Sequence, residues 1–142
     1  MADVRIRYTT LEIGDMDIHI RMLRDMLQFQ DNDGSAEKLG ISSAAWPIFG
    51  VIWPSGHVLA HLMLDYHIKG KRVLEVGCGI GLASLVLNRR SADITATDHH
   101  PETEGFLVYN TGLNSGKTIP FVRTGWAHLT NDRLGTFDLI IG

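Results

Sequence analysis

The stretch that decides the fold reads Arg72-Val73-Leu74-Glu75-Val76-Gly77-Cys78-Gly79-Ile80-Gly81-Leu82. It begins as a short apolar strand pattern, turns through three alternating glycines and continues as an apolar helix pattern. Glycines are needed where the backbone takes a positive φ and where a ligand lies against it without an intervening β-carbon. The stretch therefore predicts a ligand-binding turn between a buried strand and a helix, whose first N–H groups suit a carboxylate or phosphate.

Helix and strand patterns alternate along the rest of the second half of the chain. Strand patterns cover residues 71–76, 93–97, 119–123 and 137–141, and helix patterns cover 55–67, 80–90 and the residues that follow Pro101. Such alternation is typical of βαβ crossovers. We expect an α/β fold, with a Rossmann-like parallel sheet and helices on both of its faces.

The N-terminal residues follow a different hydrophobic pattern. Apolar and polar residues alternate from Val4 to Arg21 on either side of the step Gly14-Asp15, which predicts an antiparallel β-hairpin with one solvent-facing side. Residues 22–30 indicate a short helix or an irregular connector, and 31–35 a loop. We expect a hairpin and connector over residues 1–52 and the N-terminal part of a Rossmann-like domain over 53–142.

Composition excludes several classes of protein. The 142 residues include 13 Lys and Arg against 16 Asp and Glu, a formal net charge of −3, which argues against a general nucleic-acid or anionic-membrane binder. The single cysteine excludes an intrachain disulfide and a multi-cysteine zinc site. The N-terminus has no apolar signal core, and the apolar run from Ala44 to Pro54 is too short and proline-broken to span a membrane. We expect a cytoplasmic domain with no membrane or nucleic-acid partner.

The spacing of the glycines constrains the ligand. A dinucleotide fingerprint is G-x-G-x-x-G, whereas this turn is G-x-G-x-G with Leu82 where the third glycine would fall. Glu75, two places before the first glycine, would repel a pyrophosphate but attract an ammonium group. These two residues argue against the alternative of a nicotinamide-dependent oxidoreductase and favour a ligand that carries a cation near the turn.

Asp98 ends the second predicted strand of the parallel sheet. Ligands of open parallel sheets bind beyond the carboxyl ends of the strands, where a carboxylate can accept hydrogen bonds from the two hydroxyls of an unphosphorylated ribose. Glu75, the glycine turn and Asp98 together describe a nucleoside with a cationic amino-acid tail. The ligand with that chemistry is S-adenosyl-L-methionine.

These residues resemble a known family. The run from Val73 to Gly81 is similar to the first motif of class I (seven-strand) S-adenosylmethionine-dependent methyltransferases. The segments that follow the lysine-methyltransferase-like branch of that family, in order, are Trp53-Pro54-Ser55-Gly56, Thr97-Asp98, Asn110 with Asn114, Gly125-Trp126 and Phe137–Gly142. The resemblance covers about Trp53 to Gly142 and is weaker over the hairpin.

The resemblance implies a set of cofactor-binding residues: Trp53, Glu75, Gly77, Cys78, Gly79, Asp98, His99 and Trp126. Residues 75–79 are expected around the methionine part, Asp98 at the ribose hydroxyls and His99 beside the adenine. Trp126 is expected to line the adenine pocket and Trp53 to close the cofactor from the N-terminal side. No residue is assigned as a catalytic base, and no metal site is expected because His57 and His61 lack a third ligand.

Each candidate also has a purely structural interpretation. Glu75 could cap the turn backbone, Asp98 could be a turn residue before the Pro101 helix, and Trp53 and Trp126 could be core aromatics. Cys78 lies near a helix N-terminus that could lower its pKa, but no partner base is implied beside it, so we do not expect a nucleophile. His99 and the histidine after it are more simply a strand-end loop than a general base.

The expected activity is S-adenosylmethionine-dependent methyl transfer, with a protein lysine as acceptor. Two alternatives stay open: a small-molecule methyltransferase, and a catalytically inactive module that binds cofactor or partners. In the family the strand 137–141 continues into a substrate-lining segment, whereas this sequence ends at Gly142. We therefore expect an incomplete domain, and self-association or strand exchange through the exposed edge of that strand.

Overall fold

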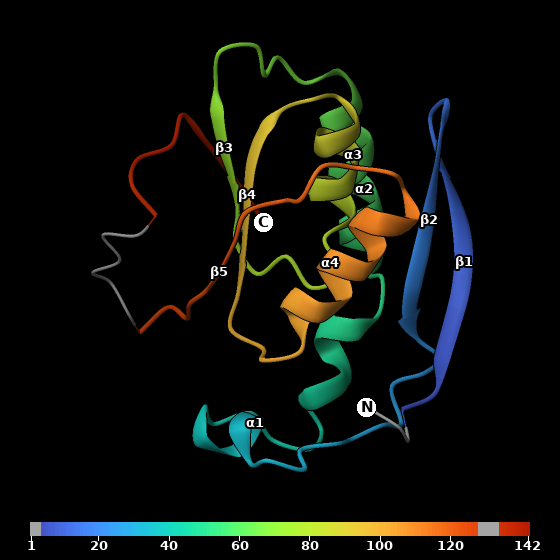
Figure 1. Ribbon diagram of the computed structural model, residues 1–142, viewed down its shortest axis with the longest axis vertical. Coiled ribbons are helices and arrows are strands. Elements are labelled where there is room, and N and C mark those ends of the chain that lie inside the picture. Colours follow the sequence, from blue (N-terminus) through green and yellow to red (C-terminus); the bar gives the residue numbers. More distant parts are fainter. Residues whose placement is uncertain (1–3, 128–133) are drawn as a thin grey trace.

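The computed structural model describes residues 4–127 and 134–142 (Figure 1). Its elements, in chain order, are β1 (Ile6–Ile13), β2 (Met16–Leu23), α1 (Ser35–Lys38), the 3₁₀ helix η1 (Trp46–Gly50), α2 (Pro54–Asp65), β3 (Arg72–Glu75), α3 (Leu82–Arg89), β4 (Asp93–Asp98), α4 (Thr103–Leu113), β5 (Phe121–Arg123) and β6 (Leu139–Ile141). Every strand and helix expected after residue 54 is present within a few residues of its expected bounds. The short helices α1 and η1 were not expected.

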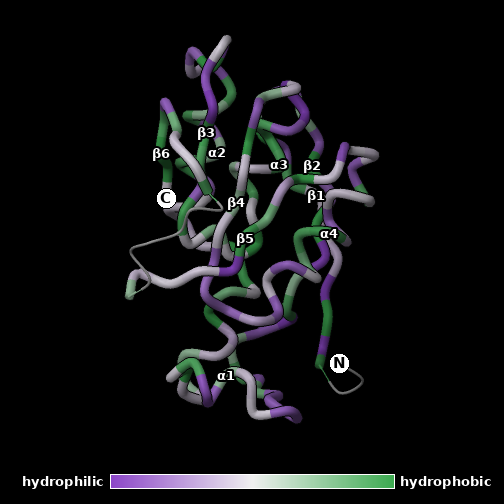
Figure 2. Tube along the Cα trace, turned by 60° about the vertical axis from the view of Figure 1, so that its left-hand side comes forward, coloured by the Kyte–Doolittle hydropathy of each residue, from purple (hydrophilic) through white to green (hydrophobic). Residues whose placement is uncertain are grey.

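Four parallel strands form the central sheet, in the order β5-β4-β3-β6 (Figure 2). Val73 of β3 is the register partner of Ile94 in β4 and of Leu139 in β6. The α/β class and the parallel sheet are therefore confirmed, as is the pairing of the strand at 137–141 with the strand before the glycines. Both central strands are buried along most of their length, and the polar Thr97 of β4 is accommodated by a hydrogen bond from its hydroxyl to the Glu75 carbonyl.

All three long helices lie on one side of this sheet, between it and the hairpin (Figure 1). The expectation of helices on both faces therefore does not hold for the described residues. The reason lies in the strand order: β3, β4 and β5 step across the sheet in one direction, and right-handed crossovers in one direction place their helices on one face. A helix on the opposite face would require a crossover that steps back, and the chain between β5 and β6 has none among its described residues.

The N-terminal hairpin is the outermost layer and confirms the expected antiparallel pair, with Ile13 and Met16 closing it around Gly14. Ile18 and Ile20 of β2 are buried in one hydrophobic core cluster with Val86 and Leu87 of α3. The core is thus continuous between the hairpin and the helices. The division of the chain at residue 52 stays a prediction.

Two asparagines of α4 bind the free edge of β2. Asn114 accepts a hydrogen bond from the His19 N–H (2.8 Å) and donates one to the His19 carbonyl (2.8 Å). Asn110, which is fully buried, makes the same pair of bonds with Arg21 at 2.7 and 3.0 Å. Four residues rise about 6 Å along a helix and two residues about 6.8 Å along a strand, so the two amides match alternate strand residues. They occupy the edge of β2 as a neighbouring strand would.

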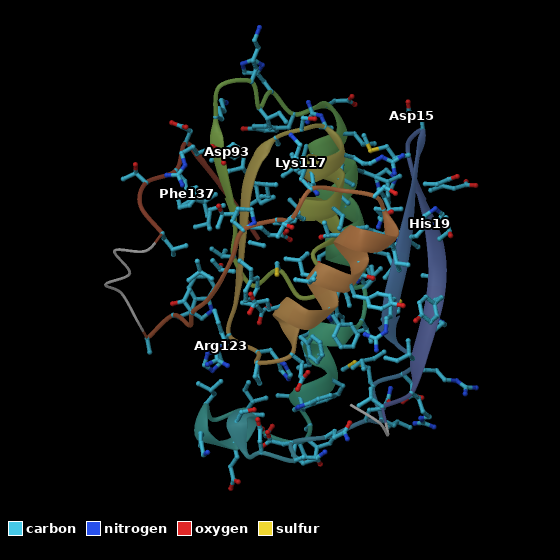
Figure 3. All side chains as sticks on the ribbon, viewed as in Figure 1. Asp15, His19, Asp93, Lys117, Arg123 and Phe137 are labelled. Carbon is cyan, nitrogen blue, oxygen red and sulfur yellow. The ribbon has the colours of Figure 1, made fainter. Side chains whose placement is uncertain are left out.

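A second set of polar contacts fastens β6 to the start of β3. The Asp138 carboxylate accepts a hydrogen bond from the Arg72 N–H (2.8 Å), and the Asp138 N–H donates to the Arg72 carbonyl (2.9 Å). The Arg72 guanidinium lies over the Phe137 ring and 3.7 Å from the Asp93 carboxylate, at the same end of the sheet (Figure 3). Asp138 is placed far from the glycine turn, as a structural residue.

One segment, Trp46–Asp65, is long and apolar enough to cross a membrane by length and composition alone, with a mean hydropathy of 1.3. The apolar run expected from the sequence ends at Pro54, whereas by this measure it continues to Asp65. In the structure this segment is not one helix but two, η1 and α2, joined through extended backbone at Val51 and Trp53. Trp46 and Phe49 of η1 are buried in the core.

Candidate functional site

The glycine turn lies at the carboxyl end of β3, beside a cavity of about 530 Å³. Seven of the eight residues expected to bind a cofactor line this cavity: Trp53, Glu75, Gly77, Cys78, Gly79, Asp98 and His99. A volume of this size is typical of small-molecule sites. The sheet order explains the gathering, because β3 and β4 are parallel neighbours and their carboxyl ends meet at one edge.

The glycines of the turn have left-handed backbone conformations but different surroundings. Gly77 has φ +60°, and among the described residues no heavy atom lies within 4 Å of the position that a β-carbon would take. Gly79 has φ +54°, and a β-carbon there would lie 3.1 Å from the carbonyl oxygen of Phe49. Gly77 therefore presents bare backbone to the cavity, whereas Gly79 lets η1 pack directly on the turn.

Glu75 is buried at the end of β3 and faces the first turn of α3. Its carboxylate accepts hydrogen bonds from the Ser84 N–H (3.0 Å) and from the Ser84 hydroxyl. Burial raises the pKa of Glu75 to about 7, against the lowering effect of the Ser84 hydrogen bonds. Glu75 therefore caps the first turn of α3 rather than the glycine turn itself, and the same carboxylate lines the cavity where it can attract a cation.

Asp98 joins the glycine turn to the chain after β4. One carboxylate oxygen accepts a hydrogen bond from the Gly79 N–H (2.8 Å), and the other accepts one from the His100 N–H (2.9 Å). A carboxylate has about four acceptor sites, so Asp98 keeps capacity for two further donors. Its side chain is half-buried at the cavity, which is the position expected for a group that binds two ribose hydroxyls.

Cys78 is held in the turn through its backbone, since its N–H donates to the Thr97 carbonyl (2.9 Å). Burial raises the pKa of the Cys78 thiol well above its usual range, and the neighbouring carboxylates of Glu75 and Asp98 add to the effect. The idea that the helix N-terminus lowers this pKa is therefore wrong, because desolvation outweighs the helix dipole. A raised pKa favours the protonated thiol, and the absence of a nucleophilic role stays a prediction.

His99 and Trp53 tie the cavity walls together. His99 Nε2 lies 3.0 Å from the carbonyl oxygen of Leu39, which belongs to the segment between α1 and η1. The Trp53 indole N–H donates to the Ile48 carbonyl at 3.0 Å, and 44% of the Trp53 residue surface is exposed. Both side chains therefore brace the N-terminal wall of the cavity.

The structure does not place Trp126 in the main cavity. Trp126 is 79% exposed and lines a neighbouring cavity of about 430 Å³, which also touches Gly77, Asp98 and His99. The two cavities share these three residues and are therefore adjacent. Trp126 therefore lines the neighbouring cavity, and its expected role at the adenine stays a prediction.

Sequence reasoning missed the wall that residues 39–52 supply. Phe49 of η1 stacks on the ring of His100 with centroids 4.0 Å apart, and Trp46 packs edge-on against the same ring at 5.2 Å. His100 is buried, and burial lowers its pKa to about 4. The aromatic cluster in Trp46-Pro47-Ile48-Phe49 was the available signal, but it carries no periodicity that distinguishes a cavity wall from a connector.

These residues fit S-adenosylmethionine on the chemistry of the donor set. The bare backbone at Gly77 accommodates an approaching ligand, the buried Glu75 carboxylate matches an ammonium group, and Asp98 has acceptor capacity for ribose. Within residues 4–127 and 134–142, no three His, Cys, Asp or Glu side chains form a group that could hold a metal ion.

Solved structures share this fold at low sequence identity. The chain superposes on the T. thermophilus 16S rRNA N2 G1207 methyltransferase (RsmC), in complex with AdoMet and guanosine, with a TM-score of 0.63, 18% identity, and coverage of 96% of this chain and 32% of that one. The ribosomal protein L11 methylase of Lactobacillus delbrueckii subsp. bulgaricus gives a TM-score of 0.58, 20% identity, and coverage of 94% and 65%. These likenesses establish the Rossmann-like methyltransferase fold.

Sequence relatives are more similar over shorter spans. The protein-lysine methyltransferase METTL21E of Bos taurus is 39% identical over 80 residues, which cover 51% of this chain and 27% of that protein. The calmodulin-lysine N-methyltransferase of Arabidopsis thaliana is 31% identical over 98 residues (63% and 32%), and the protein N-lysine methyltransferase METTL21A of Danio rerio 33% over 102 residues (67% and 46%). The chain thus spans between about a quarter and a half of the length of these relatives.

The family model described as lysine methyltransferase matches residues 37–142. This span includes η1, the glycine turn, Asp98 and the whole parallel sheet. The chain belongs to the lysine methyltransferase family.

Proposed function

We propose that this protein is an S-adenosylmethionine-dependent methyltransferase whose acceptor is a lysine of another protein. The observation that carries the proposal is the juxtaposition of the open backbone at Gly77 with two carboxylates, Glu75 and Asp98, around one cavity at the carboxyl edge of the sheet. A nucleoside with a cationic tail is the ligand that this set of groups matches best.

The chain's own residues would hold the cofactor. Glu75 would attract the ammonium of the methionine part, the backbone of the turn from Gly77 to Gly79 would lie against it, and Asp98 would accept the ribose hydroxyls. The cofactor supplies an activated methyl group when bound, and the protein's part is to hold an acceptor in line with it. No described side chain is proposed as a catalytic base.

A lysine acceptor is favoured over a small molecule by the family model and by relatives named as lysine methyltransferases. No cavity residue of this chain selects between the two. The distinguishing assay is incubation of candidate acceptor proteins with the full-length enzyme and cofactor, followed by intact-mass analysis. Mass gains in steps of one methyl group support lysine as the acceptor, and their absence from every candidate protein argues for a small molecule.

Cofactor binding is tested first, by calorimetric titration of the 142-residue chain with S-adenosylhomocysteine. We expect binding by the parent and a loss of about tenfold or more in Asp98→Asn, because the amide keeps the shape but removes the charge that strengthens hydrogen bonds to hydroxyls. Asp93→Asn is the matched control, since Asp93 lies at the opposite end of the same strand. Equal affinities of parent and Asp98→Asn would contradict the proposed site.

The proposal also covers the location of the protein and its partners. Its net charge of −3 and single cysteine support a cytoplasmic protein that acts on a protein partner rather than on nucleic acid or a membrane. We also propose that the 142-residue chain self-associates through β6, which pairs with β3 on one side only among the described strands.

A further inference from the structure

We infer that His100 is a positioning residue: its imidazole Nδ1 shapes the turn after β4 so that the His100 N–H holds the Asp98 carboxylate at the cofactor cavity. This inference rests on the proposed function, since Asp98 is the residue that would bind ribose. It adds to the proposed site a residue that does not itself bind the cofactor.

The backbone after β4 makes two consecutive turns, each closed by a side chain. The Asp98 carboxylate accepts a hydrogen bond from the N–H two residues ahead, in His100, at 2.9 Å. The His100 Nδ1 in turn accepts one from the N–H two residues ahead, in Glu102, at 3.1 Å. Glu102 is the N-cap of α4, and the Thr103 N–H donates a hydrogen bond to the His100 carbonyl. The start of α4 and the orientation of Asp98 are thus joined through one residue, since the His100 backbone N–H binds Asp98 and the His100 imidazole binds Glu102.

The bond to Glu102 also fixes the form of the imidazole. A nitrogen that accepts an N–H carries no proton, so the neutral ring has its proton on Nε2. Nε2 is buried and makes no hydrogen bond of good geometry among the residues that the structure describes, although the Trp46 backbone is close enough to raise the pKa of the ring. Packing alone does not require a ring with polar nitrogens, whereas the accepting Nδ1 has a defined partner in the Glu102 N–H.

Packing holds the ring in this position. The ring is 5% exposed and lies between Phe49, stacked at 4.0 Å, and Trp46, edge-on at 5.2 Å. Phe49 is also the residue whose carbonyl touches the turn at Gly79, and the Gly79 N–H donates to Asp98. The glycine turn, Asp98, His100 and η1 therefore form one closed set of contacts around the cavity.

The test separates the effect of the accepting nitrogen on cofactor affinity from the effect of the aromatic ring. Asparagine at position 100 retains an acceptor that can bind the N–H two residues ahead, but it loses the ring. Phenylalanine retains the stacked ring but loses the acceptor. We expect His100→Asn to bind S-adenosylhomocysteine within about threefold of the parent and His100→Phe to bind about tenfold more weakly, the factor that one lost hydrogen bond contributes. The same two substitutions at His67, beyond the end of α2 and away from the cavity, should leave the affinity unchanged.

If His100→Phe bound S-adenosylhomocysteine like the parent and His100→Asn bound it more weakly, the ring would act by packing alone, and the inference would be overturned. Equal affinities of the two variants would also overturn it. A second measurement does not depend on the variants or on cofactor binding. Nitrogen-15 shifts of the parent should show the His100 Nε2–H form at neutral pH, and a proton on Nδ1 would overturn the inference. If the parent binds no S-adenosylhomocysteine while this form is present, the proposed function fails and the turn geometry stands.

Discussion

At the residue scale, Gly77 and Gly79 share a left-handed backbone conformation but differ in the atoms that surround them. Alanine at either position incurs a left-handed strain of about 1–2 kcal/mol. At Gly79 the new methyl group would also press on the Phe49 carbonyl, whereas at Gly77 it would project into open space beside the cavity. The two substitutions should therefore have different consequences.

We expect Gly79→Ala to lower the free energy of unfolding by more than Gly77→Ala, and Gly77→Ala to weaken S-adenosylhomocysteine binding at a small cost in stability. Urea unfolding and calorimetric titration of both variants measure the two effects. Gly34→Ala is the control, because Gly34 also has a positive φ (+67°) and lies away from the cavity. If Gly77→Ala bound like the parent, the ligand would not approach the turn at this residue.

At the scale of elements, α4 holds the hairpin through two side-chain amides. We expect Asn110→Ala to lower the free energy of unfolding by about 2–3 kcal/mol, because it removes two hydrogen bonds and leaves strand groups of Arg21 without partners. Asn114→Ala should cost less, since that contact is more exposed. Urea denaturation measures both, with the exposed Asn32→Ala as control. A cost below about 0.5 kcal/mol would mean that water replaces the amide.

Elements whose sequences have a strong hydrophobic periodicity were predictable from sequence, and elements without such a periodicity were not. The alternation on both sides of Gly14 and the apolar run before Gly77 are local patterns, so the hairpin and β3 were found near their bounds. The 3₁₀ helix η1 has no such period, and its burial depends on contacts with residues of α4 and β2 that are distant in sequence. The side of the sheet that the helices cover required the strand order, which local patterns do not give.

The same limit applied to the candidate site. Glu75, the turn and Asp98 were identifiable because their spacing along two adjacent strands places them at one edge. Trp126 was assigned by its position in a motif, but its side chain direction is a tertiary property. His100 had no sequence signal that distinguishes a buried, accepting imidazole from a solvent-exposed one.

At the scale of the whole molecule, two buried groups oppose one another in their response to pH. The folded-state pKa of Glu75 is about 7, above its ordinary value of 4.5, so its contribution to stability is present below pH 4.5 and is lost as the pH rises through 7. The folded-state pKa of His100 is about 4, below 6.5, so its contribution is present above pH 6.5 and is lost as the pH falls toward 4. Burial is the main cause of both shifts, and Asp98 raises both pKa values.

We therefore expect Glu75→Gln to lose stability relative to the parent as the pH falls from 6.5 to 4.5, and His100→Phe to gain it over the same range. Each slope is at most about 1.4 kcal/mol per pH unit. Urea unfolding at pH 4.5, 5.5 and 6.5 measures the differences from the parent, which cancel the other titrating groups. Parallel profiles for the three proteins would contradict the opposed contributions.

The exposed edge of β6 gives a prediction about assembly. Ile140 is 62% exposed, and β6 is the last strand of the sheet on that side among the described residues. We expect the 142-residue chain to sediment as a concentration-dependent mixture, and Ile140→Lys to shift it toward monomer, because a charged residue on an edge strand opposes strand addition. A parent that is monomeric at every concentration would exclude self-association through this strand.

The amides of α4 also have a consequence for the order of events during synthesis. His19 and Arg21 are separated from their asparagine partners by 95 and 89 residues. At about 5–20 residues per second, the hairpin leaves the ribosome roughly 5–20 seconds before α4 can cover it. A hairpin closes in microseconds, so for that interval β2 presents an unpaired edge and an apolar face that includes Ile18 and Ile20. The nascent chain therefore has a long window in which chaperone engagement or misassembly competes with docking.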